Sequence, residues 1–331
     1  AAVAACRAAG AAPIVVGGAG YSIFPRAALE RLGADYGVRG EGETAFPALL
    51  ETIARGGDAA AIPGVLVRGG GGGSAPARSV DLDRFPAADF AAWSDAAADP
   101  ELLVPVQTRR GCAMDCAYCS TALIEGRALR FRAVESVVRD LRAVADAGFR
   151  RVFFVDNVFN EPEAYALELC RAIAALGAPL EFRAIVYPRR LSPELARAMA
   201  AAGCVETSLG FESGDPGVLR ALGKRFSPDD VRAVSDALAE RGVRRRGFLL
   251  LGGPGETMDT VARSLDFAAS LKLDALKTTV GIRIYPGTPL AAVALREGVV
   301  APGEDLLEPR FYLSPALRDH LDELPPPDPL P

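Results

Sequence analysis

Three cysteines stand close together in the segment TRRGCAMDCAYCS, with C-x3-C-x2-C spacing that puts Cys112, Cys116 and Cys119 on one loop. Three thiolates can bind three irons of a 4Fe-4S cubane, which leaves the fourth iron open to a cofactor or substrate. A zinc site needs a fourth Cys or His, and none follows at motif spacing. The spacing therefore predicts a 4Fe-4S cluster. The alternatives are a zinc knuckle and three unrelated core cysteines.

The cysteine loop follows the first of six strand-like segments, each of which precedes a helical pattern. The segments read VPVQT, RVFFVD, LEFRAIV, VETSLGF, RGFLLLG and LKTTVGIRIY. Continuous apolar strands that alternate with helices predict a parallel sheet covered by helices, the α/β class. We expect a partial (β/α)6 barrel over residues 101–300, with its chemistry at the C-terminal ends of the strands.

Polar residues stand at several of these strand ends. Asp156 and Asn157 follow the second strand, and Glu212 and Ser213 follow the fourth. Capping of the next helix is an alternative explanation for Asp156, Asn157 and Ser213, and a solvated side chain is the alternative for Glu212. Arg183 lies among apolar residues of the third strand, where a buried guanidinium would need an anion.

Glycines and one aromatic residue mark the later strand ends. The fifth strand runs into GGPGE, which contains Gly252, Gly253 and Glu256. Glycines allow the main chain to approach a flat ring closely, although such turns are common in α/β proteins. Tyr285 follows the sixth strand, where it either closes a pocket or belongs to an ordinary Pro-Gly turn. We expect Lys224, in LGKRF, to lie at the surface.

With these motifs, residues 102–300 resemble the radical SAM superfamily, whose signature is C-x3-C-x-aromatic-C after the first strand of a six-unit partial barrel. The resemblance implies that S-adenosylmethionine (SAM) binds the open iron and is cleaved reductively to methionine and a 5'-deoxyadenosyl radical. It also implies contacts to SAM from the strand-end residues. These are Asp156, Asn157, Arg183, Glu212, Ser213, Gly252, Gly253 and Tyr285.

The first 72 residues resemble the second half of a Rossmann-like cobalamin-binding domain, through VVGGAG and VRGEGETAF. We expect strands at 13–20, 36–46 and 64–70 and a helix at 47–57. The resemblance implies that Gly17 and Gly18 pack along the nucleotide tail of cobalamin. The D-x-H-x-x-G motif of that domain is absent, and His320 is no substitute. We therefore expect an incomplete domain, and cobalamin binding by the parent protein rather than by this chain.

Composition limits the remaining possibilities. Net charge is −5 among 331 residues, with the arginines scattered, so nucleic acid is not expected as a partner. Apolar stretches are too short for a transmembrane segment. Six cysteines with three of them clustered favour a reducing cytoplasm over a disulfide scaffold. We expect a linker at 73–100 and a Pro-rich, disordered tail at 301–331. The start of the sequence reads as a cut inside a helix.

The two modules together predict a cobalamin-dependent radical SAM methyltransferase acting on a small or lipid-like molecule, with a reductant such as flavodoxin or ferredoxin. A second hypothesis keeps the cluster but uses the radical for cyclisation, rearrangement or sulfur transfer. A third is a binding module without turnover. The fourth is a nucleotide-binding α/β protein with a zinc site. No catalytic residue can be assigned from the sequence.

Overall fold

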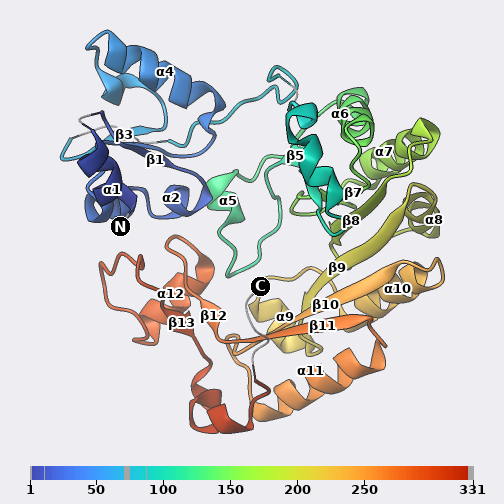
Figure 1. Ribbon diagram of the computed structural model, residues 1–331. Coiled ribbons are helices and arrows are strands. Elements are labelled where there is room, and N and C mark those ends of the chain that lie inside the picture. The colour runs from blue at the N-terminus through green and yellow to red at the C-terminus, as the bar shows by residue number, and fades with distance from the viewer. Residues whose placement is uncertain (1, 11, 71–74, 87, 327–331) are drawn as a thin grey trace.

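The computed structural model describes residues 2–10, 12–70, 75–86 and 88–326. Figure 1 shows an N-terminal part in blue and a larger part in which a curved sheet carries helices along its outer side. Between the two parts lies the short helix α5 (Thr121–Ile124). Residues 73, 74 and 87 of the predicted linker and residues 327–331 of the predicted tail lie outside the described residues.

The larger part is built on a six-stranded sheet in which every pair of neighbouring strands is parallel. This confirms the predicted α/β class. In spatial order the strands are β4 (Val104–Val106), β7 (Arg151–Phe154), β8 (Glu181–Val186), β9 (Cys204–Glu212), β10 (Arg244–Leu251) and β11 (Ala275–Val280).

Helices cover the outer face of this sheet because each buries an apolar stripe against it. Leu141, Leu169 and Leu195, on three successive helices, pack with strand residues in one core. Side-chain caps fix several starts, as at Ser227, whose hydroxyl accepts from the Asp230 amide. The helices are α6 (Val134–Asp146), α7 (Glu163–Leu176), α8 (Pro193–Ala201), α10 (Pro228–Ala239) and α11 (Met258–Ser270).

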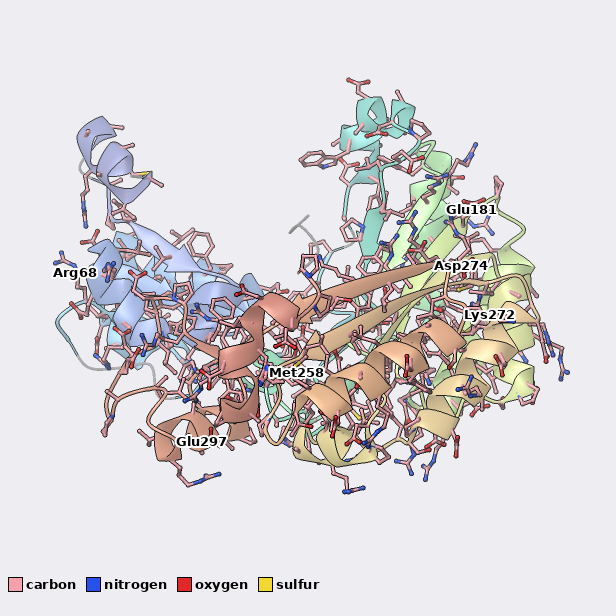
Figure 2. All side chains as sticks on the ribbon, turned by 90° about the horizontal axis from the view of Figure 1, so that it is seen from below. Arg68, Glu181, Met258, Lys272, Asp274 and Glu297 are labelled. Atoms are coloured by element: carbon pink, nitrogen blue, oxygen red, sulfur yellow. The ribbon has the colours of Figure 1, made fainter. Side chains whose placement is uncertain are left out.

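All six strands run in the same direction, so their C-terminal ends meet at one edge. Figure 2 shows Glu181, Lys272 and Asp274, which lie at or just before strand starts, grouped on the side away from the N-terminal part. Met258 lies nearer that part, at the start of α11. The C-terminal strand ends therefore face the cysteine loop and the N-terminal sheet.

The N-terminal part is a three-stranded sheet in which β1 (Val15–Gly17) and β2 (Tyr36–Val38) are parallel and β3 (Val65–Val67) is antiparallel to β2. The expected strand at 36–46 is too long, because the chain turns at Gly40 and starts a helix at Gly42. Two helices, α2 (Ala19–Ile23) and α3 (Pro25–Leu32), lie between the first two strands. Helix α1 (Ala2–Ala9) precedes β1, and α4 (Gly42–Ala54) follows β2.

The last predicted strand, at 276–285, is two strands. It breaks at Gly281, and β12 (Ile282–Arg283) pairs instead with the antiparallel β13 (Phe311–Tyr312). The expected tail thus contains a strand and the 3-10 segment η3 (Pro315–Glu323), and the expected linker contains η2 (Phe90–Ala98). The remaining elements are η1 (Ala59–Ala61), β5 (Arg109–Arg110), β6 (Arg130–Phe131), α9 (Pro216–Ala221) and α12 (Pro289–Arg296).

Within the described part of the chain, no helix combines the length and the apolar character that crossing a bilayer requires.

Candidate active site

The cysteine loop leaves the sheet after β4. Its base is closed by the antiparallel strands β5 and β6, which have two residues each. Cys112, Cys116 and Cys119 line two adjoining hollows of about 230 and 190 Å³. Only glycine fits at residue 111, because its φ is +95° and a Cβ there would lie 2.1 Å from the Ala128 carbonyl oxygen. The loop is therefore held in one path just before the first cysteine.

The thiols of this loop fit an iron–sulfur cluster. Burial raises the pKa of Cys112 and of Cys116, and the neighbouring cysteines add to both shifts, so the three sulfurs are close enough to interact. Among the described residues, no three His, Cys, Asp or Glu side chains converge on a single metal ion. A cubane does not require that convergence, since its ligands bind separate irons.

Beside the loop lies a buried network of Lys224, Glu212 and Tyr118. The Lys224 ammonium donates to Glu212 Oε1 and to Tyr118 Oη, both at 3.0 Å, and Tyr118 Oη donates to Glu212 Oε1 at 2.8 Å. The Lys224 side chain is only 5% exposed. Burial alone would lower the pKa of Lys224, but Glu212 and Tyr118 raise it well above its ordinary value. The site thus holds a buried ammonium ion close to Cys116.

The backbone turns Glu212 into the site. Register between β9 and β10 shifts at this point, so that Phe248 pairs with Gly210 and Leu249 with Glu212. Glu212 has a φ of +63°, in the left-handed region that a side chain with a Cβ rarely adopts. Such a bulge re-aims a side chain at a strand end. Strain at this position is typical of a functional site.

Asp156, expected among the contacts to SAM, lies in the interior with 0% exposure. Its oxygens accept from the Thr108 amide at 2.8 Å, the Thr108 hydroxyl at 2.6 Å and the Arg109 amide at 3.2 Å. The Arg109 side chain, 2% exposed, places Nε 3.5 Å from the carboxylate. Burial raises the pKa of Asp156 above its usual range, with Arg109 opposing the shift.

Asn157 lies in the pocket with the cysteines and Glu212. Its Nδ2 donates to Glu125 Oε2 at 2.8 Å, and the same oxygen accepts from the Gly111 amide at 2.9 Å. The Cys119 thiol donates to Thr121 Oγ1 at 3.3 Å. A chain of polar contacts therefore connects the end of β7 to both sides of the loop.

Other predicted residues lie outside the lining of the two hollows. Ser213 is buried and its hydroxyl lies 2.9 Å from that of Ser264. Arg183 is on β8, and its register partner on β9 is Glu206. Arg183 Nη1 lies 3.8 Å from Glu206 Oε1. Tyr285 has its ring centroid 6.2 Å from that of Phe24 in the N-terminal part.

The two glycines after β10 bind a buried carboxyl group. The amides of Gly252 and Gly253 donate to Glu256 Oε2, and burial raises the pKa of Glu256 to about 7. In the N-terminal part, Gly17 and Gly18 form the exposed turn between β1 and α2. Helix α2 packs against α5 of the cysteine loop, as Figure 1 shows.

The pocket therefore brings together the three cysteines, Asn157 and Glu212 among the predicted residues. Tyr118 and Lys224 also line it, with Met114, Ile185 and Tyr187. The prediction that Lys224 lies at the surface is wrong, because the fold closes Tyr118, Glu212 and Phe226 around it. The sequence signal was weak, since a lysine shortly after a strand is more often solvated.

A sheet of six parallel strands, helices on its outer face and a cysteine loop after the first strand define an α/β protein of the partial-barrel type. Residues 106–268 match the radical SAM superfamily, so this part of the chain is a radical SAM domain. Its cofactors are accordingly a 4Fe-4S cluster and SAM.

Comparison with known proteins gives relatives that cover most of the chain. An uncharacterized methyltransferase of Pyrococcus horikoshii is 27% identical over 87% of this chain and 64% of its own length. The tryptophan 2-C-methyltransferase of Streptomyces laurentii is 29% identical over 85% of this chain and 58% of its own length. This chain therefore spans less than two thirds of both relatives.

A solved structure of the radical SAM methyltransferase TsrM from Kitasatospora setae, with cobalamin and a [4Fe-4S] cluster bound, matches over both parts of the fold. It is 25% identical, with a TM-score of 0.82 over 96% of this chain and 69% of that one. The match extends across the N-terminal sheet as well as the six-stranded sheet, because it covers nearly the whole chain.

Proposed function

We propose that this chain belongs to a cobalamin-dependent methyltransferase that acts on a small or lipid-like molecule, with Cys112, Cys116 and Cys119 as the ligands of its 4Fe-4S cluster. One observation carries the proposal: the three thiols together line a recess of two adjoining hollows at the C-terminal strand ends, next to a buried carboxylate and ammonium ion. When bound, the cluster supplies the electron that cleaves the sulfonium bond of SAM.

The residues around the recess have complementary tasks in this proposal. Glu212 and Asn157 offer a carboxylate and an amide to the polar end of SAM, and Lys224 offers a cation. A pocket that excludes water strengthens each of these interactions. Tyr118, between the second and third cysteines, fixes the Lys224 ammonium by a hydrogen bond of 3.0 Å.

We assign the other strand-end residues to positioning rather than to contact with SAM. Asp156 already accepts three hydrogen bonds from Thr108 and Arg109, so it holds the start of the loop. The amides of Gly252 and Gly253 already donate to Glu256. These glycines therefore shape the site through the path of the main chain and not through hydrogen bonds to SAM. Arg183 faces Glu206 instead of the cysteines.

Support for cobalamin comes from the N-terminal part and from the relatives. Gly17 and Gly18 are exposed, and a Cβ added at Gly18 would have no atom within 4 Å, so an approaching ligand would meet backbone only. This turn leads into α2, which packs against α5. A ligand over the turn would therefore lie toward the cysteine loop. When bound, cobalamin carries the transferred methyl group.

The test is anaerobic reconstitution of the chain with iron, sulfide and a reductant, followed by SAM carrying a deuterated methyl group, with and without cobalamin. We expect iron and labile sulfide in a 4Fe-4S ratio, together with 5'-deoxyadenosine and methyl transfer that both depend on the reductant. The triple Cys112→Ala/Cys116→Ala/Cys119→Ala variant is the control and should lose both.

Zinc in place of iron, or an intact cluster that neither cleaves SAM nor transfers its methyl group, would refute the proposal. A deoxyadenosine product without any methylated product would instead favour the second hypothesis of a cyclisation, rearrangement or sulfur-transfer reaction.

A further inference from the structure

The RGEGE segment of the N-terminal part has no role in the proposed chemistry, yet its first glutamate is buried. Glu41 follows Gly40, whose φ is +89° and where a Cβ would lie 2.5 Å from the Ala77 carbonyl oxygen. Only glycine fits this turn, which brings Glu41 under the chain that leaves the N-terminal sheet. Its side chain is 9% exposed.

Two arginines of the larger part reach the Glu41 carboxylate. Arg130 Nη1 lies 2.6 Å from Oε1, and Arg110 Nη1 lies 3.3 Å from Oε2. The Ser79 amide donates to Oε2 at 2.6 Å. The side chains of Arg110 and Arg130 are only 20% and 12% exposed, so these pairs are shielded from water far more than ordinary surface ion pairs.

Both arginines belong to the hairpin at the base of the cysteine loop. Arg110 is in β5 and Arg130 is in β6, and the two are register partners. The chain between them contains all three cysteines. A carboxylate that binds both arginines therefore holds together the two ends of the loop.

Further contacts carry this restraint from the hairpin into the loop. Arg130 Nη2 donates to the Glu125 carbonyl at 2.9 Å, and Glu125 Oε2 accepts from the Gly111 amide at 2.9 Å. The Cys112 amide donates to the Gly126 carbonyl at 3.0 Å. The ion pair of Glu41 with Arg130, these hydrogen bonds and short stretches of the covalent chain therefore connect Glu41 to the first cysteine.

Glu43 lies in the same motif but has a different environment. It pairs with Arg110, its side chain is 35% exposed, and within the described part of the chain it forms no ion pair with Arg130. Arg110 is thus shared by two carboxylates, whereas Glu41 is the acidic partner of Arg130 within the described part of the chain. Loss of Glu43 leaves both arginines paired.

We propose that Glu41 is a positioning residue for the cysteine loop, and that the RGEGE motif couples the N-terminal sheet to the cluster rather than contacting a cofactor. The inference rests on the proposed function in one respect, the assignment of the three cysteines as ligands. Partners outside the first coordination shell orient metal ligands, and their loss weakens metal binding.

The experiment compares Glu41→Gln with Glu43→Gln, which makes the same chemical change two residues away. Both variants and the unmodified chain are reconstituted with iron and sulfide, and cluster loss to a chelator is followed by visible absorbance. We expect about tenfold faster loss in Glu41→Gln, the lower end of what outer partners of metal ligands cost. Glu43→Gln should stay within about twofold of the unmodified chain, as exposed pairs contribute little.

A second variant separates positioning from general destabilisation. In Glu41→Gln/Arg130→Gln the uncompensated guanidinium is gone, so the free energy of unfolding should recover, whereas the cluster should still be lost faster than from the unmodified chain because the contact to the loop is also gone. If Glu41→Gln does not fold, Glu41→Asp keeps the charge with a shorter side chain and should also lose the cluster faster. The EPR spectrum of the reduced cluster should change in Glu41→Gln and not in Glu43→Gln.

Equal rates of cluster loss in Glu41→Gln and the unmodified chain would overturn the inference, and so would equal effects of the two glutamate variants. These results differ from failure of the proposed function. In that case the unmodified chain itself would form no cluster.

Discussion

Replacement of Asp156 by asparagine distinguishes a positioning role from direct contact with SAM. The carboxylate is 0% exposed and accepts bonds from Thr108 and Arg109. Asparagine keeps an oxygen for the two amide donors but removes the charge opposite the buried Arg109 guanidinium. Removal of one charge of a buried pair costs about 3–5 kcal/mol. Because part of the hydrogen bonding survives, we expect Asp156→Asn to lower the free energy of unfolding by about 3 kcal/mol.

The assay is urea denaturation of the cluster-free chain, followed by circular dichroism. Glu194→Gln is the matched control, since Glu194 and its partner Arg171 are 55% and 65% exposed and the loss should stay below about 0.5 kcal/mol. The double variant Arg109→Met/Asp156→Asn should be more stable than Asp156→Asn, as no unpaired charge remains. A loss below about 1 kcal/mol with SAM binding abolished would refute the reasoning and favour direct contact with SAM.

Two further predictions concern the cysteines and Glu256. Single alanine replacements of Cys112, Cys116 or Cys119 should reduce bound iron and sulfide to background after reconstitution, whereas Cys6→Ala, on the exposed face of α1, should retain both. Burial raises the pKa of Glu256 from 4.5 to about 7, so the folded chain holds a proton that the unfolded chain releases between these values. The stability that this proton contributes is present below about pH 4.5 and lost as pH rises through 7, up to ~3 kcal/mol in total. Urea denaturation at pH 4.5 and pH 8 should show this loss in the unmodified chain and not in Glu256→Gln, and a parallel loss in both would contradict it.

The six-stranded sheet could be predicted because residues close together in the sequence identify each of its strands and helices. Each strand is a continuous apolar segment and each helix has its own buried stripe, so neighbouring residues suffice to identify them. Strand ends were less certain where one residue changes the path. The expected strand at 276–285 ignored Gly281, and the expected strand at 36–46 ignored Gly40.

The site could be predicted only where spacing along the chain carries the chemistry. Cys112, Cys116 and Cys119 are close in sequence, so their grouping on one loop needed no knowledge of the fold. Lys224 is different, because its burial depends on Tyr118, which is 106 residues away in sequence. Asp156 was correctly placed at a strand end, but only the fold shows that Arg109 lies opposite it.

The charged pairs around the cysteine loop are better explained by the position that they specify than by the stability that they add. The hairpin at the base of the loop has only two residues in each strand, so backbone pairing alone restrains it weakly. Burial raises the pKa of Asp156 even though Arg109 opposes it, which means that the charged carboxylate is less favourable there than in water. Apolar side chains would avoid that cost but would accept many alternative packings. A buried ion pair accepts few, because any other arrangement leaves a charge without its partner.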